Sequence, residues 1–199
     1  MKKFELTNEF ITNMFGTKLF RIRALVEFGD VEAGELGGYV EKESNLGHDD
    51  NAWVYDNAWV YGDAQVSGDA QVSGDARVYG DAQVSGNALV CGDALVYDNA
   101  RVYGNALVCG DARVCGNGDY AYARGFGSVN RTTTFFRLKD GGVGVRCGCF
   151  YGTLAQFRDK IRETHGETKK AQEYLMLADL MELRFEEDEN EVGNRKYVE

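Results

Sequence analysis

The chain has 199 residues, of which 44% are hydrophobic, so it can bury a core and is too apolar for wholesale disorder. Its formal net charge of −10 argues against a surface that binds nucleic acid or anionic membranes in general. We therefore expect no direct nucleic-acid partner and no membrane partner. The chain contains no proline, so every strand can donate its ladder hydrogen bonds.

The cysteines and the N-terminus indicate the compartment. The chain has five cysteines, an odd number with no framework spacing. MKKFELTNEF has two lysines but no long apolar stretch after them, and no apolar run is long enough to span a membrane. These features favour a cytoplasmic protein with reduced thiols.

Residues 1–50 predict an N-terminal strand and a degenerate first coil. The first 17 residues are weakly patterned, and Lys18 to Phe28 alternates well enough to be a strand. A degenerate repeat follows, with Val31, Val40 and Leu46 at inward positions. We expect this coil to shield the next one, because an open solenoid end exposes unpaired strand edges. Its predicted corners are Gly29, Gly34, Gly37, Gly38 and Gly47.

Residues 51–116 are eleven consecutive hexapeptides without insertion. An alanine recurs every six residues from Ala52 to Ala112, and a valine from Val54 to Val114. Alternation within a strand places each alanine and valine on one face, and the Gly, Asp and Asn residues that follow tolerate the backbone of a tight corner. Stacked strands of this kind make a solenoid, which we assign to residues 51–130. The hexads are NAWVYD NAWVYG DAQVSG DAQVSG DARVYG DAQVSG NALVCG DALVYD NARVYG NALVCG DARVCG.

Residues 131–185 predict a small cap, beginning with a hairpin. The repeat decays after Gly116, and residues 132–138 and 143–151 read as two strands. Asp-Gly, in the segment between them, is a favoured pair for a tight turn.

Two helices complete the cap. Thr153 and Gln156 have capping-box spacing and open the first helix, which ends near Gly166. The second starts near Thr168 and lines up Ala171, Tyr174, Leu175, Ala178 and Met181 on one face. The tail, residues 186–199, is predicted to be flexible.

Three segments resemble known proteins. The hexads resemble the hexapeptide-repeat superfamily, whose three hexads form one triangular coil of a left-handed parallel β-helix. GDVEAGELGGYV with NAWVYDNA, and TFFRLKDGGVGVRCGCFYGTLAQFRDKIRETHG, are similar to hexapeptide-repeat proteins of tailed phages and prophages and to uncharacterised bacterial acetyltransferase-like proteins. The resemblance implies a mainly β protein, a left-handed β-helix of about four regular coils with a C-terminal ββαα cap, in the cytoplasm of a bacterial host.

With eighteen residues per coil, the outward positions sort into three faces. The aromatic face carries Trp59, Arg77, Leu95 and Arg113, alternating with Tyr61, Tyr79, Tyr97 and Cys115. The apolar face carries Trp53, Gln71, Leu89 and Leu107 beside Tyr55, Ser73, Cys91 and Cys109. The glutamine face carries Gln65, Gln83 and Arg101 with Ser67, Ser85 and Tyr103.

Two of these faces are candidate contacts. Trp, Tyr and Arg are enriched among interface hot spots, so we predict partner binding by Trp59, Tyr61, Arg77, Tyr79, Tyr97 and Arg113. The alternative is that like residues merely stack and support the ladder. The apolar face predicts contact with the cap or with another subunit through Leu89, Cys91, Leu107 and Cys109.

The corners form aspartate columns, most clearly Asp75, Asp93 and Asp111. Some β-helices hold calcium with stacked aspartates, but their repeat has nine residues and is rich in glycine, unlike these hexads. We therefore interpret these aspartates as side chains that hydrogen-bond locally within the turn. We expect no metal and no cofactor.

The two histidines lie outside the hexads. Acyltransferases on this scaffold use a histidine base, and His48 beside Asp49 and Asp50 is the candidate, against the commoner exposed loop histidine. His165 is placed at a helix C-terminus, a structural position. Cys147 and Cys149 are placed on one strand as small buried residues, because no further zinc ligands have suitable spacing.

The sequence therefore favours a non-catalytic phage-type binding protein that engages and inhibits a host defence protein through its β-helix surface. Acidic corners could mimic nucleic-acid charge, which suits a host protein that normally binds nucleic acid. Two alternatives stay open. One is an oligomeric sponge holding a nucleotide-like signal at subunit junctions through Arg77, Arg101 or Arg113, and the other is an acyltransferase using His48. We also expect a homo-oligomer, a trimer or a dimer.

Overall fold

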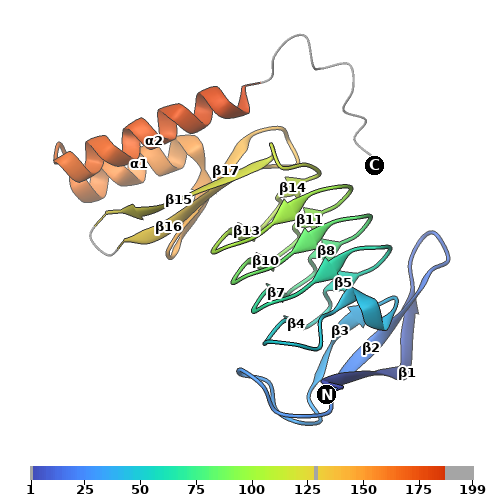
Figure 1. The fold of residues 1–199 in the computed structure, drawn as a ribbon. Coiled ribbons are helices and arrows are strands. Elements are labelled where there is room, and N and C mark those ends of the chain that lie inside the picture. The colour runs from blue at the N-terminus through green and yellow to red at the C-terminus, as the bar shows by residue number, and fades with distance from the viewer. Residues whose placement is uncertain (1, 128–129, 187–199) are drawn as a thin grey trace.

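Three regions follow one another along the molecule. The computed structural model describes residues 2–127 and 130–186, and all of the predicted tail (residues 186–199) except residue 186 lies outside them. An N-terminal hairpin leads into a column of stacked short strands, and a sheet with two helices covers the far end (Figure 1). Within the described residues, no helix is both long enough and apolar enough to cross a membrane.

The N-terminal region contains one more strand than predicted. β1 (Phe4–Thr12) pairs antiparallel with β2 (Lys18–Ala24), which pairs antiparallel with β3 (Leu36–Val40); a 3₁₀ helix, η1 (Glu43–Asn45), follows. β2 matches the predicted strand but ends at Ala24, and β1 was not predicted. The inward positions of the first coil are confirmed, because all three side chains are buried: Val31, Val40 and Leu46.

Two predicted corners of the first coil are wrong. Gly37 and Gly38 lie inside β3, where a Cβ atom on Gly38 would stand 2.6 Å from the carbonyl oxygen of Ala58. The two glycines instead let β3 approach the column closely, so that β3 pairs in parallel with β5 (Trp59–Val60). Gly29 and Gly34 do have positive φ angles, as corners require.

The column is a parallel β-solenoid of about four turns, as predicted. Three ladders form it, and every alanine and valine of the repeat is buried. The handedness stays a prediction. Besides β5, its strands are β4 (Trp53–Val54), β6 (Gln65–Val66), β7 (Gln71–Val72), β8 (Arg77–Val78), β9 (Gln83–Val84), β10 (Leu89–Cys91), β11 (Leu95–Val96), β12 (Arg101–Val102), β13 (Leu107–Cys109) and β14 (Arg113–Val114).

The register confirms that side chains eighteen residues apart lie above one another. Trp59 pairs with Arg77, and Leu95 pairs with both Arg77 and Arg113. The corners need glycine for this stacking: Gly86 has a φ of 69°, and a Cβ atom there would lie 3.0 Å from the backbone nitrogen of the glycine one coil above. The repeat therefore fixes which residues share a face.

The cap sheet has four antiparallel strands, two more than the predicted hairpin. Their order is β15 (Tyr120–Phe126), β16 (Arg131–Arg137), β17 (Val143–Cys147) and β18 (Phe150–Thr153). The predicted second strand is divided by a turn at Gly148, whose φ is 58°. The prediction that Cys147 and Cys149 lie on one strand is therefore wrong. Cys149 is exposed, whereas it was predicted to be buried.

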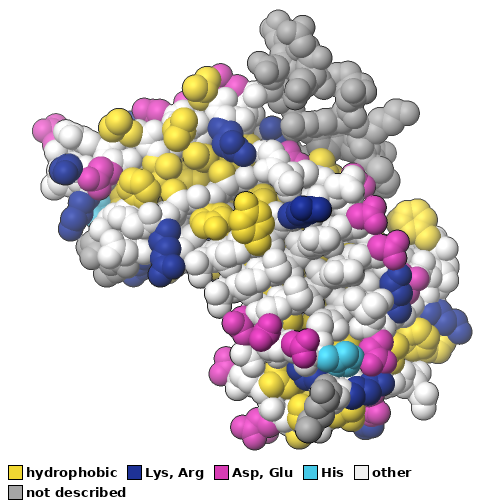
Figure 2. All heavy atoms as spheres, viewed as in Figure 1, with side chains coloured by type: hydrophobic (Ala, Val, Ile, Leu, Met, Phe, Trp, Pro, Cys, Tyr) yellow, Lys and Arg dark blue, Asp and Glu magenta, His cyan; other side chains and the backbone are white. Residues whose placement is uncertain are grey.

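Both predicted helices are confirmed. α1 (Leu154–His165) opens with a capping box of Thr153 and Gln156, and α2 (Lys169–Phe185) has Thr168 as its N-cap. Figure 1 shows the helices on the side of the cap sheet away from the column, and Figure 2 shows hydrophobic side chains gathered on the cap.

The cap sheet is buried on both faces. Tyr120 and Phe136 belong to the hydrophobic core of the column, whereas Phe135 and Val145 belong to a second core beneath the helices. One face of the sheet therefore closes the end of the column, which a solenoid requires for solubility.

Candidate functional site

The aromatic face contains a stack of three parallel tyrosine rings. The ring centroids of Tyr61 and Tyr79 are 5.0 Å apart, and those of Tyr79 and Tyr97 are 5.2 Å apart, with interplanar angles of 5° and 9°. Each tyrosine directly follows the strand of its coil, so the spacing of about 4.8 Å between parallel strands sets the spacing of the rings. The backbone of the column therefore holds the three rings at stacking distance.

A cation–π pair lies beside the stack. The Arg77 guanidinium carbon lies 4.2 Å from the ring centroid of Trp59, one coil below it in the same ladder. Arg77 is nevertheless exposed, so its remaining N–H donors face solvent. The pair holds a long, flexible cation in one orientation, which lowers the entropy lost when it binds something.

Burial raises the pKa values of the tyrosine hydroxyl groups in the stack above an ordinary value that already leaves them protonated at neutral pH. It raises the pKa of Tyr61 to about 12 and also raises the pKa values of Tyr79 and Tyr97. At neutral pH these hydroxyl groups therefore stay protonated and can both donate and accept hydrogen bonds.

The six predicted partner-binding residues differ in accessibility. Tyr97 is only 8% exposed, and the Arg113 guanidinium donates to the backbone oxygen atoms of Asp93 and Ala112, at 3.0 and 2.9 Å. These two side chains therefore contact mainly the column itself. The accessible part consists of one exposed and three half-buried side chains: Arg77, Trp59, Tyr61 and Tyr79.

The face continues onto the N-terminal strands, an extension not predicted from sequence. Tyr39 pairs with Trp59, the Arg21 guanidinium carbon lies 5.3 Å from the Tyr39 ring centroid, and the Tyr39 hydroxyl donates to Glu9 at 3.2 Å. Tyr39 lies twenty residues before Trp59 instead of eighteen. Allowing for the two extra residues around His48 would have aligned it with the ladder.

The apolar face is covered at both ends of the column. Trp53 is fully buried, with the ring of Phe4 at 6.2 Å and that of Phe28 at 5.3 Å. At the other end Cys109 is 5% exposed, and the Leu107 backbone N–H donates to Thr134 of the cap at 2.9 Å. Of the four predicted contact residues, Cys109 is buried and the other three are half-buried. Contact with another subunit stays a prediction.

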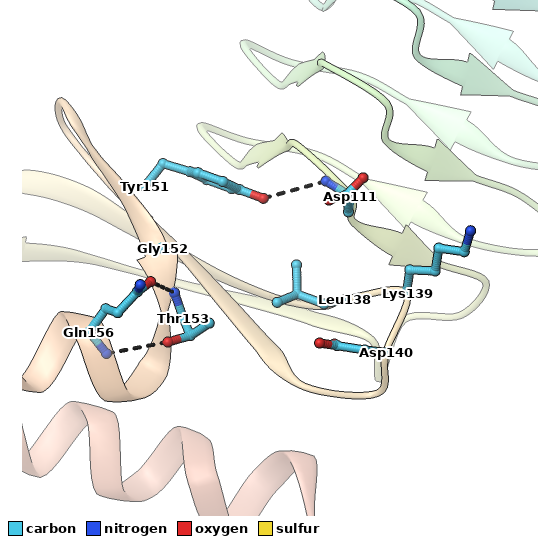
Figure 3. Close-up of a pocket in the computed structure, with 8 residues that line it drawn as sticks. All are labelled: Asp111, Leu138, Lys139, Asp140, Tyr151, Gly152, Thr153 and Gln156. Atoms are coloured by element: carbon cyan, nitrogen blue, oxygen red, sulfur yellow. Dashed lines mark hydrogen bonds between the residues drawn. The ribbon is translucent and has the colours of Figure 1, made fainter.

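A junction cavity of about 690 Å³ lies between the last coil and the cap. Figure 3 shows Asp111 and Tyr151 on its two sides, and the Asp111 backbone N–H donates to the Tyr151 hydroxyl at 3.4 Å. Thr153 and Gln156 bond to each other in the helix cap (2.9 and 3.3 Å). No sequence pattern predicted this cavity, because its walls come from segments far apart in the chain.

The histidines have structural partners. The Lys3 backbone N–H donates to His48 Nδ1 at 3.1 Å, and His48 Nε2 lies 2.8 Å from Glu43. Since Nδ1 accepts, the proton lies on Nε2 and is donated to Glu43, which leaves neither nitrogen free to act as a base. The ring stacks on Phe4 with centroids 4.5 Å apart, so His48 is not an exposed loop residue.

Possible metal ligands are scattered. Within residues 2–127 and 130–186, no three His, Cys, Asp or Glu side chains come together in a way that could hold a metal ion. The aspartate columns stand at the corners of the coils as predicted, with Asp75, Asp93 and Asp111 exposed. They border the aromatic face, because the corner after each strand of the apolar face leads into a strand of the aromatic face.

Comparison with known families supports the repeat assignment. Residues 70–86, 82–98, 94–110 and 100–116 match the model of a family described as the YdcK beta solenoid repeat. The column is similar to this repeat. The matched segments lie within the column and include neither the N-terminal hairpin nor the cap. No curated protein matches the chain.

Proposed function

We propose that the protein is a non-catalytic, phage-type binding protein whose aromatic face engages and inhibits a host protein. The observation that carries the proposal is the ordered set of Trp59, Tyr61, Arg77 and Tyr79 on one ladder of the column. Aromatic and arginine side chains supply most interface hot spots, and side chains already held in place lose less entropy on binding.

The shape of the face suits a protein surface. It belongs to a continuous sheet of seven strands, running from β1 through β3 to β14. Its contact residues are therefore spread over several coils instead of converging on a point. Such an arrangement matches the extended patches that proteins use to bind one another.

The acidic corners support a proposal about the chemistry of the partner. Asp75, Asp93 and Asp111 are exposed beside the aromatic face, repeating at the coil spacing of about 4.8 Å. Within a chain of net charge −10, this column favours a partner with a basic surface, such as a defence protein that normally binds nucleic acid.

The geometry around His48 favours this function over the acyltransferase alternative. Both His48 nitrogens are engaged, which argues against a general base for acyl transfer. Arg77 and Arg113 lie on the aromatic face, whereas Arg101 lies on the glutamine face. The three arginines therefore do not converge on one nucleotide within a subunit, and the sponge alternative depends on a junction between subunits.

The proposal is tested by removing the accessible part of the face. The double variant Arg77→Ala/Tyr79→Ala leaves the buried Tyr97 in place. Its matched control is Gln83→Ala/Ser85→Ala, which changes the equivalent two positions of a hexad on the glutamine face. Tagged proteins are used to enrich partners from a bacterial lysate, followed by quantitative mass spectrometry, with circular dichroism to confirm folding.

We expect the aromatic-face variant to enrich the partner at least about tenfold less than wild type, because hot-spot truncation costs about 2 kcal/mol or more. The control variant should enrich it as wild type does. Equal enrichment by all three proteins would remove the aromatic face as the binding surface.

A further inference from the structure

The cap contains a second, smaller cavity, of about 260 Å³, between the edge of its sheet and the helices. Its floor is apolar and comes from three elements. Phe150 lies on β18, Phe157 and Ile161 on α1, and Tyr174 on α2, and all four belong to or pack against the core of the cap. The aromatic face of the column is not part of it.

Aromatic rings meet at right angles and in parallel around this cavity. The ring centroids of Phe150 and Phe157 are 5.4 Å apart, and Phe157 meets the Tyr174 ring edge-on at 5.9 Å and 83°. His165, the last residue of α1, stacks on Tyr174 with centroids 6.0 Å apart. The walls therefore offer ring faces and edges, which suit a flat aromatic ligand.

The ionisable side chains that line the cavity include three basic ones, those of Arg131, Lys160 and His165. Among residues 2–127 and 130–186, no carboxylate lines it. This composition is unusual in a chain of net charge −10, and the junction cavity by contrast includes Asp111 and Asp140. An apolar cavity edged by basic groups favours an anion with an apolar body.

Arg131 is the group best placed to hold that anion. Lys160 is engaged by Glu163 at 2.8 Å, on the surface of α1. In residues 2–127 and 130–186, by contrast, no carboxylate pairs with the Arg131 guanidinium, which lies across Gly148 in the turn between β17 and β18. Its planar fork of N–H donors matches the two oxygen atoms of a carboxylate.

We propose that this cavity binds a small aromatic carboxylate. The ring lies among Phe150, Phe157 and Tyr174, and the carboxylate pairs with Arg131. The volume lies just below the range of about 300–1,000 Å³ that is typical of drug-sized ligand sites, so the ligand has a single ring. The site is independent of the partner-binding face.

Calorimetric titration of the purified full-length chain tests the proposal with 3-phenylpropanoate as the probe. We expect saturable binding with one site per chain. The neutral analogue 3-phenylpropanamide and the ringless acid hexanoate should each bind at least about tenfold more weakly, because one lacks the charge and the other the ring. No binding of the acid, or equal binding of either analogue, would overturn the proposal.

Two variants place the site. Arg131→Gln should weaken 3-phenylpropanoate binding at least about tenfold, and Arg131 is exposed, so the fold should survive. Arg101→Gln removes an exposed arginine from the column and should bind as wild type does. Equal losses in both variants would indicate a general charge effect and contradict the assigned site. Arg77→Ala/Tyr79→Ala should also bind the probe normally, which separates this proposal from the proposed function.

Discussion

The column and the cap present surfaces of opposite kinds. In the column each outward position is repeated one coil above, so side chains eighteen residues apart stack into ladders such as that of Tyr61, Tyr79 and Tyr97. The cap has no repeat, and its helices and strands leave a cavity edged by basic groups. A repeated backbone makes faces suited to proteins, whereas irregular packing of large side chains makes hollows suited to small ligands.

The two regions also differ in how they are stabilised. The column interior consists mainly of small alanine and valine side chains. The cap contributes two large rings to that interior, those of Tyr120 and Phe136, and the Phe136 ring is fully buried. The column therefore depends on the cap for closure of its end.

The largest expected effect comes from removing the Phe136 ring. Phe136→Ala should lower the free energy of unfolding by about 3–5 kcal/mol, the usual cost of emptying a buried phenylalanine site. The matched control Phe15→Ala changes a side chain that is 72% exposed at the hairpin tip and should cost no more than about 0.5 kcal/mol. Urea denaturation measures both, and similar losses would mean that Phe136 does not close the column.

A corner substitution should have an intermediate effect. Gly86 has a φ of 69°, and a Cβ atom would meet the backbone of Gly104 at 3.0 Å, so Gly86→Ala should cost about 1–3 kcal/mol. Gly118 lies beyond the hexads with nothing within 4 Å of its Cβ position, and Gly118→Ala should be nearly neutral. If the two variants unfold at the same urea concentration, the corners do not limit the stacking of the coils.

The smallest expected effect is a pH dependence carried by the tyrosine stack. Burial raises the pKa of Tyr61 from 10.0 to about 12, so between these values the folded state keeps a proton that the unfolded state has lost. The resulting stabilisation is fully present below pH 10 and is lost as the pH rises through 12. Tyr61→Phe should flatten the decline of the urea midpoint between pH 10 and 12. A decline as steep as that of wild type would contradict this assignment.

The positions of the repeat could be predicted from the sequence, whereas a strand with irregular pairing could not. Ala52 to Val114 could be placed because one spacing recurs without interruption. β1 was missed because its pairing with β2 shifts register between Leu6 and Phe10, which breaks the alternation that marks a strand.

The candidate sites divide in the same way. The aromatic face could be predicted because successive residues of a ladder are eighteen positions apart in the sequence. Tyr39 was missed because it lies twenty positions before Trp59. The cap cavity could not be predicted, because Arg131, Lys160 and His165 come together through the docking of α1 onto the sheet. No local pattern encodes that arrangement.

The most direct test of partner binding by the aromatic face is photo-cross-linking in bacterial cells. Benzoylphenylalanine replaces Tyr61 in one protein and Tyr103, an exposed tyrosine of the glutamine face, in another. We expect a covalent adduct with one host protein from position 61 and none from position 103. An adduct from position 103 alone, or equal adducts from both positions, would contradict partner binding by the aromatic face.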